Sequence, residues 1–421
     1  MPHDFGNSRQ RPTQAVILAG GRGTRLKPLT DNRPKPMVLI GGKPFLEYQI
    51  EQLREQGFER VLLLLGYLPE VVRDYFGDGR RWGVRIEYSI TAVDDETGRR
   101  VKLAEPLLDP CFLLMYCDNY WPMSLARMWE RFRVSEVPAM ITVYSNKDGY
   151  TRNSVRVEAD GKVSIYDKSC SDPTLNGVEI SYAILSKEVL KLLDDENRLF
   201  ETTVYPALVA RGQLAGYVSD HRYYSVGAHH RLPLTESFFK RQKTVLVDRD
   251  GVLNRKPPRA DYVRCWREFE WLPQAQAALR LLRENDFQVI VVSNQAGLAR
   301  GAMTESDLSD IHARMKQEVH ETGGEIAAIY YCPHDWDSGC ECRKPRPGML
   351  FQAQRDFHLD LSRTTFIGDD ERDGEAARAA GCFFLRVTQD KSFFDCVQEM
   401  IGKLSTEGNH DGATTSAHHG S

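Results

Sequence analysis

Two aspartates one residue apart follow an apolar run near the middle of the chain. Residues 244–251 read Thr-Val-Leu-Val-Asp-Arg-Asp-Gly, which predicts a strand that ends at Asp248 and Asp250. Side chains at positions i and i+2 of a strand point to the same side, so both carboxylates can face one site at the strand's end. One carboxylate can attack phosphorus while the other moves protons, and carboxylate oxygens also suit a divalent cation. The pair therefore predicts phosphoryl chemistry.

Three further motifs follow in the order that phosphoryl transfer needs. They are Ser293-Asn294 after an apolar run, Arg343-Lys344, and Asp369 after a second apolar run. A lone Asp-x-Asp is most often a solvated turn or a helix cap, but four elements in this order are far more specific. Ser293 and Lys344 are predicted to bind phosphoryl oxygens, and Asn294 is predicted to contact the substrate. Asp369, with Asp248, is predicted to hold Mg²⁺.

This set resembles the haloacid dehalogenase-like phosphatases, over residues 244 to about 390. The resemblance implies that Asp248 attacks phosphorus and becomes an aspartyl phosphate. Asp250 would protonate the leaving oxygen and then take a proton from water. Lys344 would offset charge in the transition state, and the Mg²⁺ ligands would be Asp248, Asp250 and Asp369.

Three cysteines and a histidine precede the Arg-Lys pair. They are Cys332, His334, Cys340 and Cys342, which form a Cys₃His set suited to tetrahedral, structural Zn²⁺. The one-residue gaps are tighter than in ordinary zinc fingers, and a chance cluster in a loop is the alternative. Because Arg343-Lys344 follow Cys342 directly, a zinc ion there would position the catalytic cations.

The run Cys-Pro-His…Cys-x-Cys-Arg-Lys-Pro-x-Pro-Gly-Met closely resembles the heptose bisphosphate phosphatases. The resemblance makes Arg343 a second contact for substrate phosphate. Histidinol phosphatases share the zinc loop but usually lack the Pro-Gly-Met continuation at 347–349. One departure is Asp370, where heptose phosphatases often carry lysine, and the lost positive charge would weaken binding of a second phosphate.

A glycine-rich loop follows the first apolar strand of the chain. Residues 18–30 read Leu-Ala-Gly-Gly-Arg-Gly-Thr-Arg-Leu-Lys-Pro-Leu-Thr. Glycines let the backbone approach a polyphosphate, and Arg22 and Arg25 add charge-assisted hydrogen bonds to its oxygens. Pro34-Lys35-Pro36 then fixes a lysine on a stiff loop. A tight turn is the alternative for the glycines alone, but the combination favours a phosphate site.

This segment resembles the signature of the sugar-phosphate nucleotidyltransferases, which make nucleotide-sugars from a nucleoside triphosphate and a sugar 1-phosphate. The resemblance implies that Gly20, Gly21, Gly23 and Arg25 hold the triphosphate and that Lys35 stabilises charge on the α-phosphate. It also makes Asp118 a metal ligand, Lys168 a contact for the sugar phosphate, and Asn176-Gly177 part of the sugar pocket.

Two departures weaken the expectation of transferase activity. The family's second metal-binding aspartate is replaced by Ser225, and a neutral hydroxyl is a poor Mg²⁺ ligand. The family's Gly-Thr-Ala-Gly nucleotide loop is also missing between Ile90 and Pro110, where only Arg99-Arg100-Val101-Lys102-Leu103 stands near its place. Either the loop is rebuilt or nucleotide binding is altered.

The elements that position these motifs alternate between helix and strand in both halves. In the first half we expect strands at 14–20, 61–65, 84–90 and 112–116 and helices at 44–56 and 69–76. In the second we expect strands at 244–248, 288–292, 326–331 and 364–368 and helices at 273–284, 304–321 and 347–357. Such alternation predicts an α/β protein with two doubly wound domains, each with a mostly parallel, Rossmann-like sheet.

The predicted boundaries are a loose tail at 1–13, a transferase domain at 14–232, a linker or short connecting helix at 233–243, a phosphatase domain at 244–403 and a disordered tail at 404–421. The 421 residues are 41% hydrophobic and 27% charged, as is ordinary for a soluble protein, and the net charge of −4 gives no support to nucleic-acid or membrane binding. The N-terminus lacks the apolar core of a signal peptide, which predicts a cytoplasmic protein.

The two resemblances together predict consecutive reactions. A 7-phosphatase acting on D-glycero-D-manno-heptose 1,7-bisphosphate leaves a heptose 1-phosphate, which a nucleotidyltransferase would activate. The glycine-loop type is linked by resemblance to GDP-heptose, so we expect GTP as the nucleotide and the α anomer as the phosphatase substrate. Two alternatives stay open: a phosphatase joined to a non-catalytic sugar-phosphate or nucleotide-binding module, and a phosphatase for another sugar phosphate or for histidinol phosphate.

Overall fold

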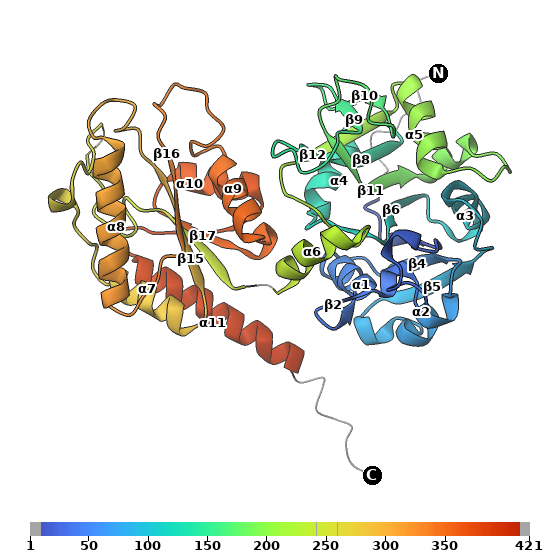
Figure 1. The fold of residues 1–421 in the computed structure, drawn as a ribbon, viewed down its shortest axis with the longest axis horizontal. Coiled ribbons are helices and arrows are strands. Elements are labelled where there is room, and N and C mark those ends of the chain that lie inside the picture. The colour runs from blue at the N-terminus through green and yellow to red at the C-terminus, as the bar shows by residue number, and fades with distance from the viewer. Residues whose placement is uncertain (1–9, 241, 259, 413–421) are drawn as a thin grey trace, which may run out of the picture. The chain divides into compact units, whose positions relative to one another are not determined.

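The computed structural model describes residues 10–240, 242–258 and 260–412. The chain divides into two compact units, Met1–Lys240 and Arg241–Ser421, and each is described by itself (Figure 1). No helix in the described part of the chain is both long enough and apolar enough to cross a membrane. The predicted α/β class with two Rossmann-like domains is confirmed.

A seven-stranded sheet forms the centre of the first unit, in the order β12-β8-β11-β6-β1-β4-β5. Its strands are β1 (Gln14–Ala19), β4 (Arg60–Leu65), β5 (Arg85–Ile90), β6 (Cys111–Tyr116), β8 (Ala139–Tyr144), β11 (Val178–Ser186) and β12 (Leu214–Ser219). All neighbours run parallel except β11, which is antiparallel to both β6 and β8. Short two-stranded ladders pair β2 (Leu39–Ile40) with β3 (Lys43–Pro44), β7 (Asn119–Tyr120) with β13 (Tyr224–Ser225), and β9 (Val155–Val157) with β10 (Val163–Tyr166).

Alternate residues of the central strands supply two separate cores. In β1, Ala15 and Ile17 belong to one buried cluster, whereas Val16 and Leu18 belong to the other. Side chains of a strand point alternately to its two faces, and a strand buried on both faces is therefore apolar at nearly every position. The helices beside this sheet are α1 (Phe45–Glu55), α2 (Pro69–Phe76), α3 (Thr97–Leu103), α4 (Leu125–Val134) and α5 (Phe200–Ala210).

Most of the predicted linker is a helix that belongs to the first unit. Helix α6 (Leu232–Phe239) buries Phe238 and Phe239. The Phe238 ring stacks on Tyr224 and the Phe239 ring on Tyr48, each with ring centroids 3.9 Å apart. Stacked aromatic pairs add to the free energy gained by burial, so this segment is fixed against the transferase-like unit.

The second unit contains a five-stranded parallel sheet in the order β16-β15-β14-β17-β18. Its strands are β14 (Thr244–Val247), β15 (Gln288–Asn294), β16 (Ala328–Cys332), β17 (Thr365–Gly368) and β18 (Phe383–Arg386). Its helices are α7 (Ala275–Glu284), α8 (Glu305–Glu321), α9 (Gly348–Phe357), α10 (Glu371–Ala380) and α11 (Phe393–Gly412). Side chains of α7, α8 and α11 share one buried cluster, and those of α9 and α10 share the other.

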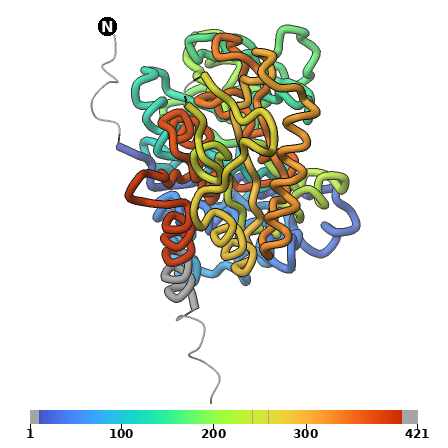
Figure 2. The backbone as a smooth tube through the Cα atoms, turned by 90° about the vertical axis from the view of Figure 1, so that its left-hand side faces the viewer, coloured from blue at the N-terminus to red at the C-terminus, as the bar shows by residue number. Residues whose placement is uncertain are grey.

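Helix α11 is longer than the predicted domain allows. It runs to Gly412, which places the segment 404–412 in a helix instead of the predicted tail, while 413–421 lie outside the described residues. Its buried side chains Phe393, Cys396, Val397 and Met400 recur at helical spacing and pack in the cluster that α7 also joins. The two helices lie side by side in Figure 1 and Figure 2.

Candidate active sites

The two motif aspartates of the second unit lie at the carboxyl end of the central strand β14. Asp248 is 7% exposed and follows Val247 directly. Open α/β sheets bind ligands at this edge, where loops from neighbouring strands converge. Gly251 has a φ of +97°, and a Cβ at this position would collide with the Asp369 carboxylate. The glycine therefore lets the loop turn tightly beside a second aspartate.

Lys344 is buried between two carboxylates of this site. Its Nζ lies 2.9 Å from Asp248 Oδ1 and 2.8 Å from Asp373 Oδ1, and it donates to the Val292 carbonyl at 2.9 Å. Burial would lower the pKa of Lys344, but Asp248 and Asp373 outweigh it and raise the pKa above its ordinary value. The lysine is therefore a fixed cation against the Asp248 carboxylate.

Asp250 is held in a different hydrogen-bond network from Asp248. Arg249 donates to both of its oxygens at 3.0 and 2.9 Å, and Asn254 and Gln295 each donate to it at 2.9 Å. Burial works to raise the pKa of Asp250, but the Arg249 charge and these hydrogen bonds outweigh it and lower the pKa. Asp250 is therefore ionised at rest, the state that suits a base.

The groups expected to bind phosphoryl oxygens lie beside these aspartates. Ser293 is 1% exposed and accepts from Gln295 Nε2 at 2.7 Å. Asn294 forms two hydrogen bonds with the backbone of Lys344. Its Nδ2 donates to the Lys344 carbonyl at 3.0 Å, and its Oδ1 accepts from the Lys344 amide at 3.1 Å. This double contact, between residues 50 positions apart in sequence, fixes the lysine loop to β15.

Three carboxylates form a group that suits a divalent cation. One oxygen from each of Asp248, Asp369 and Asp373 lies within 4.8 Å of the others. Asp369 Oδ1 is buried without a hydrogen-bond partner, although a buried carboxylate oxygen is costly unless something binds it. A Mg²⁺ ion fits this donor set. Asp373 belongs to this group, whereas the Asp250 carboxylate accepts hydrogen bonds from Arg249, Asn254 and Gln295. Asp250 as a Mg²⁺ ligand stays a prediction.

The predicted zinc ligands converge. Cys332 Sγ lies 3.6 Å from Cys340 Sγ and 3.3 Å from Cys342 Sγ, and Cys342 Sγ lies 3.2 Å from His334 Nδ1. A zinc tetrahedron with about 2.3 Å Zn–S bonds has edges of about 3.8 Å, so these separations suit one ion, and they are too long for a disulfide. Arg343 donates to the His334 carbonyl at 3.3 Å and does not line the cavity that Lys344 and Asp248 share.

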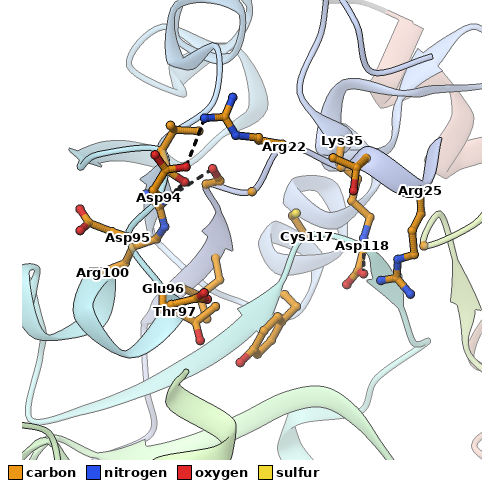
Figure 3. A pocket seen from close by; sticks show the side chains of 18 residues that line it. Arg22, Arg25, Lys35, Asp94, Asp95, Glu96, Thr97, Arg100, Cys117 and Asp118 are labelled. Carbon is orange, nitrogen blue, oxygen red and sulfur yellow. Dashed lines mark hydrogen bonds and ion pairs between the residues drawn. The ribbon is translucent and has the colours of Figure 1, made fainter. Parts of the chain in front are cut away.

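The glycine loop of the first unit borders a pocket of about 520 Å³. The structure brings seven predicted residues together in its lining, namely Gly20, Gly21, Arg22, Gly23, Arg25, Lys35 and Asp118. Lys35 Nζ lies 2.5 Å from Asp118 Oδ2. Figure 3 shows Arg25, Lys35 and Asp118 on one side of the pocket, with Arg22 and Asp94 on the other.

The segment without the Gly-Thr-Ala-Gly motif is rebuilt around a buried arginine. Arg100, on α3, is 3% exposed and donates to the carbonyls of Leu65, Ala92 and Val93 at 2.9 to 3.0 Å. It also contacts the Gly20 carbonyl at 3.4 Å, and a Cβ at position 20 would collide with the guanidinium. The rebuilt segment therefore packs directly on the glycine loop and supplies Asp94, Asp95, Glu96 and Thr97 to the pocket lining.

Ser225 stands beside Asp118, as expected for the replaced aspartate. Strand β13 pairs with β7 so that Ser225 faces Asn119. The Ser225 hydroxyl donates to the Asp118 carbonyl at 3.0 Å and accepts from the Gly227 amide at 3.0 Å. Its oxygen is thus engaged by the backbone, and Asp118 is the one carboxylate on this side of the described pocket lining.

Comparison with known proteins shows the family of each unit. A nucleotidyl transferase family model matches residues 14–233, and a HAD-hydrolase-like model matches residues 341–394. The D-glycero-β-D-manno-heptose-1,7-bisphosphate 7-phosphatase of Pseudomonas aeruginosa is 43% identical over 138 residues, covering 33% of this chain and 76% of that protein. The chain belongs to the nucleotidyl transferase family and, through its second unit, to the heptose-bisphosphate 7-phosphatases.

Other relatives cover one unit each. An α-anomer 7-phosphatase of Photorhabdus laumondii is 30% identical over 154 residues, covering 34% of this chain and 82% of that protein. The solved Bordetella bronchiseptica phosphatase with magnesium and phosphate is 31% identical, covers 38% of this chain and 99% of that chain, and has a TM-score of 0.36. The HddC structure from Yersinia pseudotuberculosis, also solved with GMP-PN, is 25% identical, covers 54% of this chain and 99% of that chain, and has a TM-score of 0.46.

Two residues expected in the sugar pocket of the transferase unit do not line the described pocket. Asn176 exchanges two 2.9 Å hydrogen bonds with the backbone of Val157, so both polar atoms of its side chain already hold β9. Lys168 forms an ion pair with Glu179, with Nζ 3.7 Å from Oε2. Tyr116 and Thr97 do line the pocket, and both donate to Glu201, at 2.6 and 3.0 Å.

Sequence reasoning missed several residues of the phosphatase unit. Gln295 and Asn254 fix Asp250, and Lys256 and Arg372 line the cavity that Asp248 and Lys344 share. Gln295 stands two positions after Ser293, so the alternation of side chains along a strand places both on the same face. The sequence therefore contained a signal for Gln295. The others come from loops and a helix start, where no periodic pattern marks them.

A buried histidine supports the Asp250 network and makes the phosphatase unit sensitive to acid. His312 Nε2 lies 3.4 Å from Arg249 Nη1, and burial and the Arg249 charge lower the pKa of His312 to about 3. The unfolded chain binds this proton below about pH 6.5, so the contribution of neutral His312 to stability is lost as pH falls from there. Between pH 7 and pH 5, we expect the free energy of unfolding of His312→Gln to fall by about 2 kcal/mol less than that of the wild type.

Hydrogen exchange of the β14 and α8 amides at the two pH values measures this difference. His320→Gln, at an exposed position of the same helix, is the control and should behave as the wild type. Equal acid sensitivity of His312→Gln and the wild type would contradict the prediction.

Proposed function

We propose that the phosphatase unit removes the 7-phosphate of D-glycero-D-manno-heptose 1,7-bisphosphate and that the transferase unit joins the resulting heptose 1-phosphate to a nucleotide, with GTP as the donor. The observation that carries the proposal is Lys344, buried between Asp248 and Asp373 in a unit that is 43% identical to a heptose-bisphosphate 7-phosphatase. The first product is the second substrate, which gives a reason for the fusion. Both substrates are phosphorylated metabolites, which favours the cytoplasm.

The phosphatase residues divide the reaction between them. Asp248 attacks the phosphorus, and the bond to the sugar oxygen breaks as the aspartyl phosphate forms. Lys344 and Ser293 stabilise the charge on the phosphoryl oxygens. Asp250, which is ionised at rest, relays to the leaving oxygen the proton that a monoanionic phosphoryl group brings. In the second step, Asp250 takes a proton from the water that hydrolyses the aspartyl phosphate. Mg²⁺, held by Asp248, Asp369 and Asp373, would supply positive charge beside the phosphoryl group.

In the transferase unit, the phosphate-binding groups lie on the glycine loop and the Pro-Lys-Pro loop. Backbone amides of Gly20, Gly21 and Gly23 would cradle the triphosphate, with Arg25 paired to its oxygens. Lys35 would offset charge on the α-phosphate while an oxygen of the sugar phosphate attacks it and pyrophosphate leaves. Asp118 would hold Mg²⁺, and the zinc cluster of the other unit would be structural, with no open position for chemistry.

A single assay tests both halves. We would supply heptose 1,7-bisphosphate with GTP and Mg²⁺ and follow phosphate and pyrophosphate separately. Release of both supports the proposal. If phosphate is released but no pyrophosphate is released from GTP, ATP, UTP, CTP or dTTP, the chain is a phosphatase whose first unit is a non-catalytic binding module. A higher kcat/KM for histidinol phosphate or another sugar phosphate would remove the heptose assignment.

The anomer of the substrate has two candidates. Coupling to a GDP-heptose route favours the α anomer. Sequence identity favours the β anomer. The Pseudomonas aeruginosa β-anomer phosphatase is 43% identical to this chain, whereas the Photorhabdus laumondii α-anomer phosphatase is 30% identical. We retain the α anomer because the transferase unit must use the product. Comparing kcat/KM for the two anomers decides, and equal or reversed preference would refute this choice.

A carboxylate at position 225 should strengthen metal binding in the transferase unit. Ser225→Asp restores a second acidic group beside Asp118, and carboxylate number tunes affinity for divalent cations. We expect the Mg²⁺ concentration for half-maximal pyrophosphate release to fall about tenfold. Phosphate release by the other unit of the same variant is the control and should keep its Mg²⁺ requirement. An unchanged Mg²⁺ dependence of pyrophosphate release would contradict the prediction.

A further inference from the structure

Two cations line the phosphatase cavity without taking part in the steps above. Lys256 follows the Asp248 loop, and Arg372 lies in the first turn of α10. Their side chains are 43% and 47% exposed, whereas Lys344 in the same cavity is 2% exposed. The buried lysine therefore serves the reacting phosphoryl group, and the two exposed cations face the part of the cavity that opens to solvent.

Asp370 holds both of these cations. Its Oδ2 lies 3.1 Å from Lys256 Nζ and 2.9 Å from Arg372 Nη2, and its Oδ1 accepts from Arg372 Nε at 3.0 Å. Lys256 also reaches Asp369 Oδ2 at 2.7 Å. When Mg²⁺ binds the metal group, the Asp369 carboxylate is shared with the ion and balances Lys256 less. Two positive charges on the single Asp370 carboxylate then leave an excess of positive charge at the rim.

We propose that Lys256 and Arg372 bind the second phosphate of the substrate, with Asp370 positioning both. The inference rests on the proposed function, in which the substrate carries one phosphate for Asp248 and another on the far end of the sugar. A carboxylate at position 370 repels phosphate by itself. Once paired with a lysine and an arginine, it becomes the support of a phosphate site, because guanidinium and ammonium groups are the preferred partners of phosphate oxygens.

A purely structural role is the competing explanation. Asp370 caps α10, accepts from the Arg372 amide, and forms a capping box with Asp373. If Arg372 and Lys256 only secured this cap, their loss would loosen Asp373 and Asp369 and would slow hydrolysis of every substrate alike. A phosphate site instead predicts that the loss depends on whether the substrate carries a second phosphate.

The experiment compares heptose 1,7-bisphosphate with heptose 7-phosphate, using the full chain. Lys256→Gln and Arg372→Gln should each lower kcat/KM for the bisphosphate about tenfold, mainly through KM, since each removes a charge-assisted hydrogen bond. The values for heptose 7-phosphate should change less than about threefold. The controls are Lys316→Gln on α8 and Arg378→Gln on α10, which remove cations outside the cavity lining and should leave both substrates unaffected.

Each remaining outcome is decisive. Equal losses on both substrates overturn the proposal in favour of the structural role, and no loss on either also overturns it. Failure of the proposed function is a separate result, in which the wild type prefers another bisphosphate, such as fructose 1,6-bisphosphate. The same variants tested on that compound and on fructose 6-phosphate then decide the inference. If the wild type hydrolyses no bisphosphate better than the corresponding monophosphate, the inference of a second phosphate site is overturned.

Discussion

Asp248→Asn should abolish phosphate release while leaving pyrophosphate release by the other unit intact. The amide keeps the shape of the side chain but is a poor nucleophile, and it also removes a carboxylate from the metal group and a partner of Lys344. We expect kcat to fall by about a thousandfold or more, as it does when an enzyme loses its nucleophile. Phosphate release from heptose 1,7-bisphosphate measures the loss.

Two controls show that this loss is local. Heptose 1-phosphate supplied directly with GTP should release pyrophosphate at the wild-type rate, because Asp248 belongs to the second unit and the transferase pocket to the first. Asp310→Asn, at an exposed position of α8, removes an aspartate away from the cavity and should hydrolyse the bisphosphate normally. More than a tenth of the wild-type rate in Asp248→Asn would exclude the aspartyl phosphate mechanism.

Loss of zinc should have the second large effect. Structural Zn²⁺ contributes about 10 kcal/mol or more to the folding of zinc-finger peptides, comparable with the whole stability of a domain. In this chain, Cys342 is joined directly to Arg343 and Lys344, and Lys344 must stay between Asp248 and Asp373. We expect Cys340→Ser to release zinc and to lower phosphatase kcat by about a hundredfold or more, because the lysine loop loses its anchor.

Metal analysis and phosphate release together test this prediction. The matched control is Cys265→Ser, which removes an exposed cysteine of the same unit outside the cluster and should keep both zinc and activity. Unchanged zinc content in Cys340→Ser would rule out the site. Loss of zinc with full activity would show that the ion does not position Lys344.

Much of the fold follows from local patterns. The apolar runs at 14–20, 61–65 and 288–292 correspond to β1, β4 and β15, because a strand buried on both faces is apolar at most positions. Strand β18 escaped prediction: it is four residues long, lies at the sheet edge and exposes Phe383 by 63%. Strands β8, β11 and β12 were not predicted either. The antiparallel direction of β11 could not be predicted, since a strand's own residues do not specify its partner's direction.

The sequence by itself determined where the chemistry begins. A strand end carries Asp248 and Asp250 to one edge of the sheet, and the close spacing of Cys340 and Cys342 keeps two predicted zinc ligands together, since both depend on a few consecutive bonds. Only the tertiary structure decided how the charges are shared. It directs Asp250 to Arg249 and Gln295 and gives Asp373 to Lys344 and the metal group.

The tertiary structure likewise brings Lys256 and Arg372 to the same carboxylate, Asp370, and places Arg100 against the glycine loop. These contacts link segments that are distant in sequence, and the packing of whole helices and loops fixes their distances. No local periodicity encodes that packing, so residue types alone did not reveal which cation meets which carboxylate.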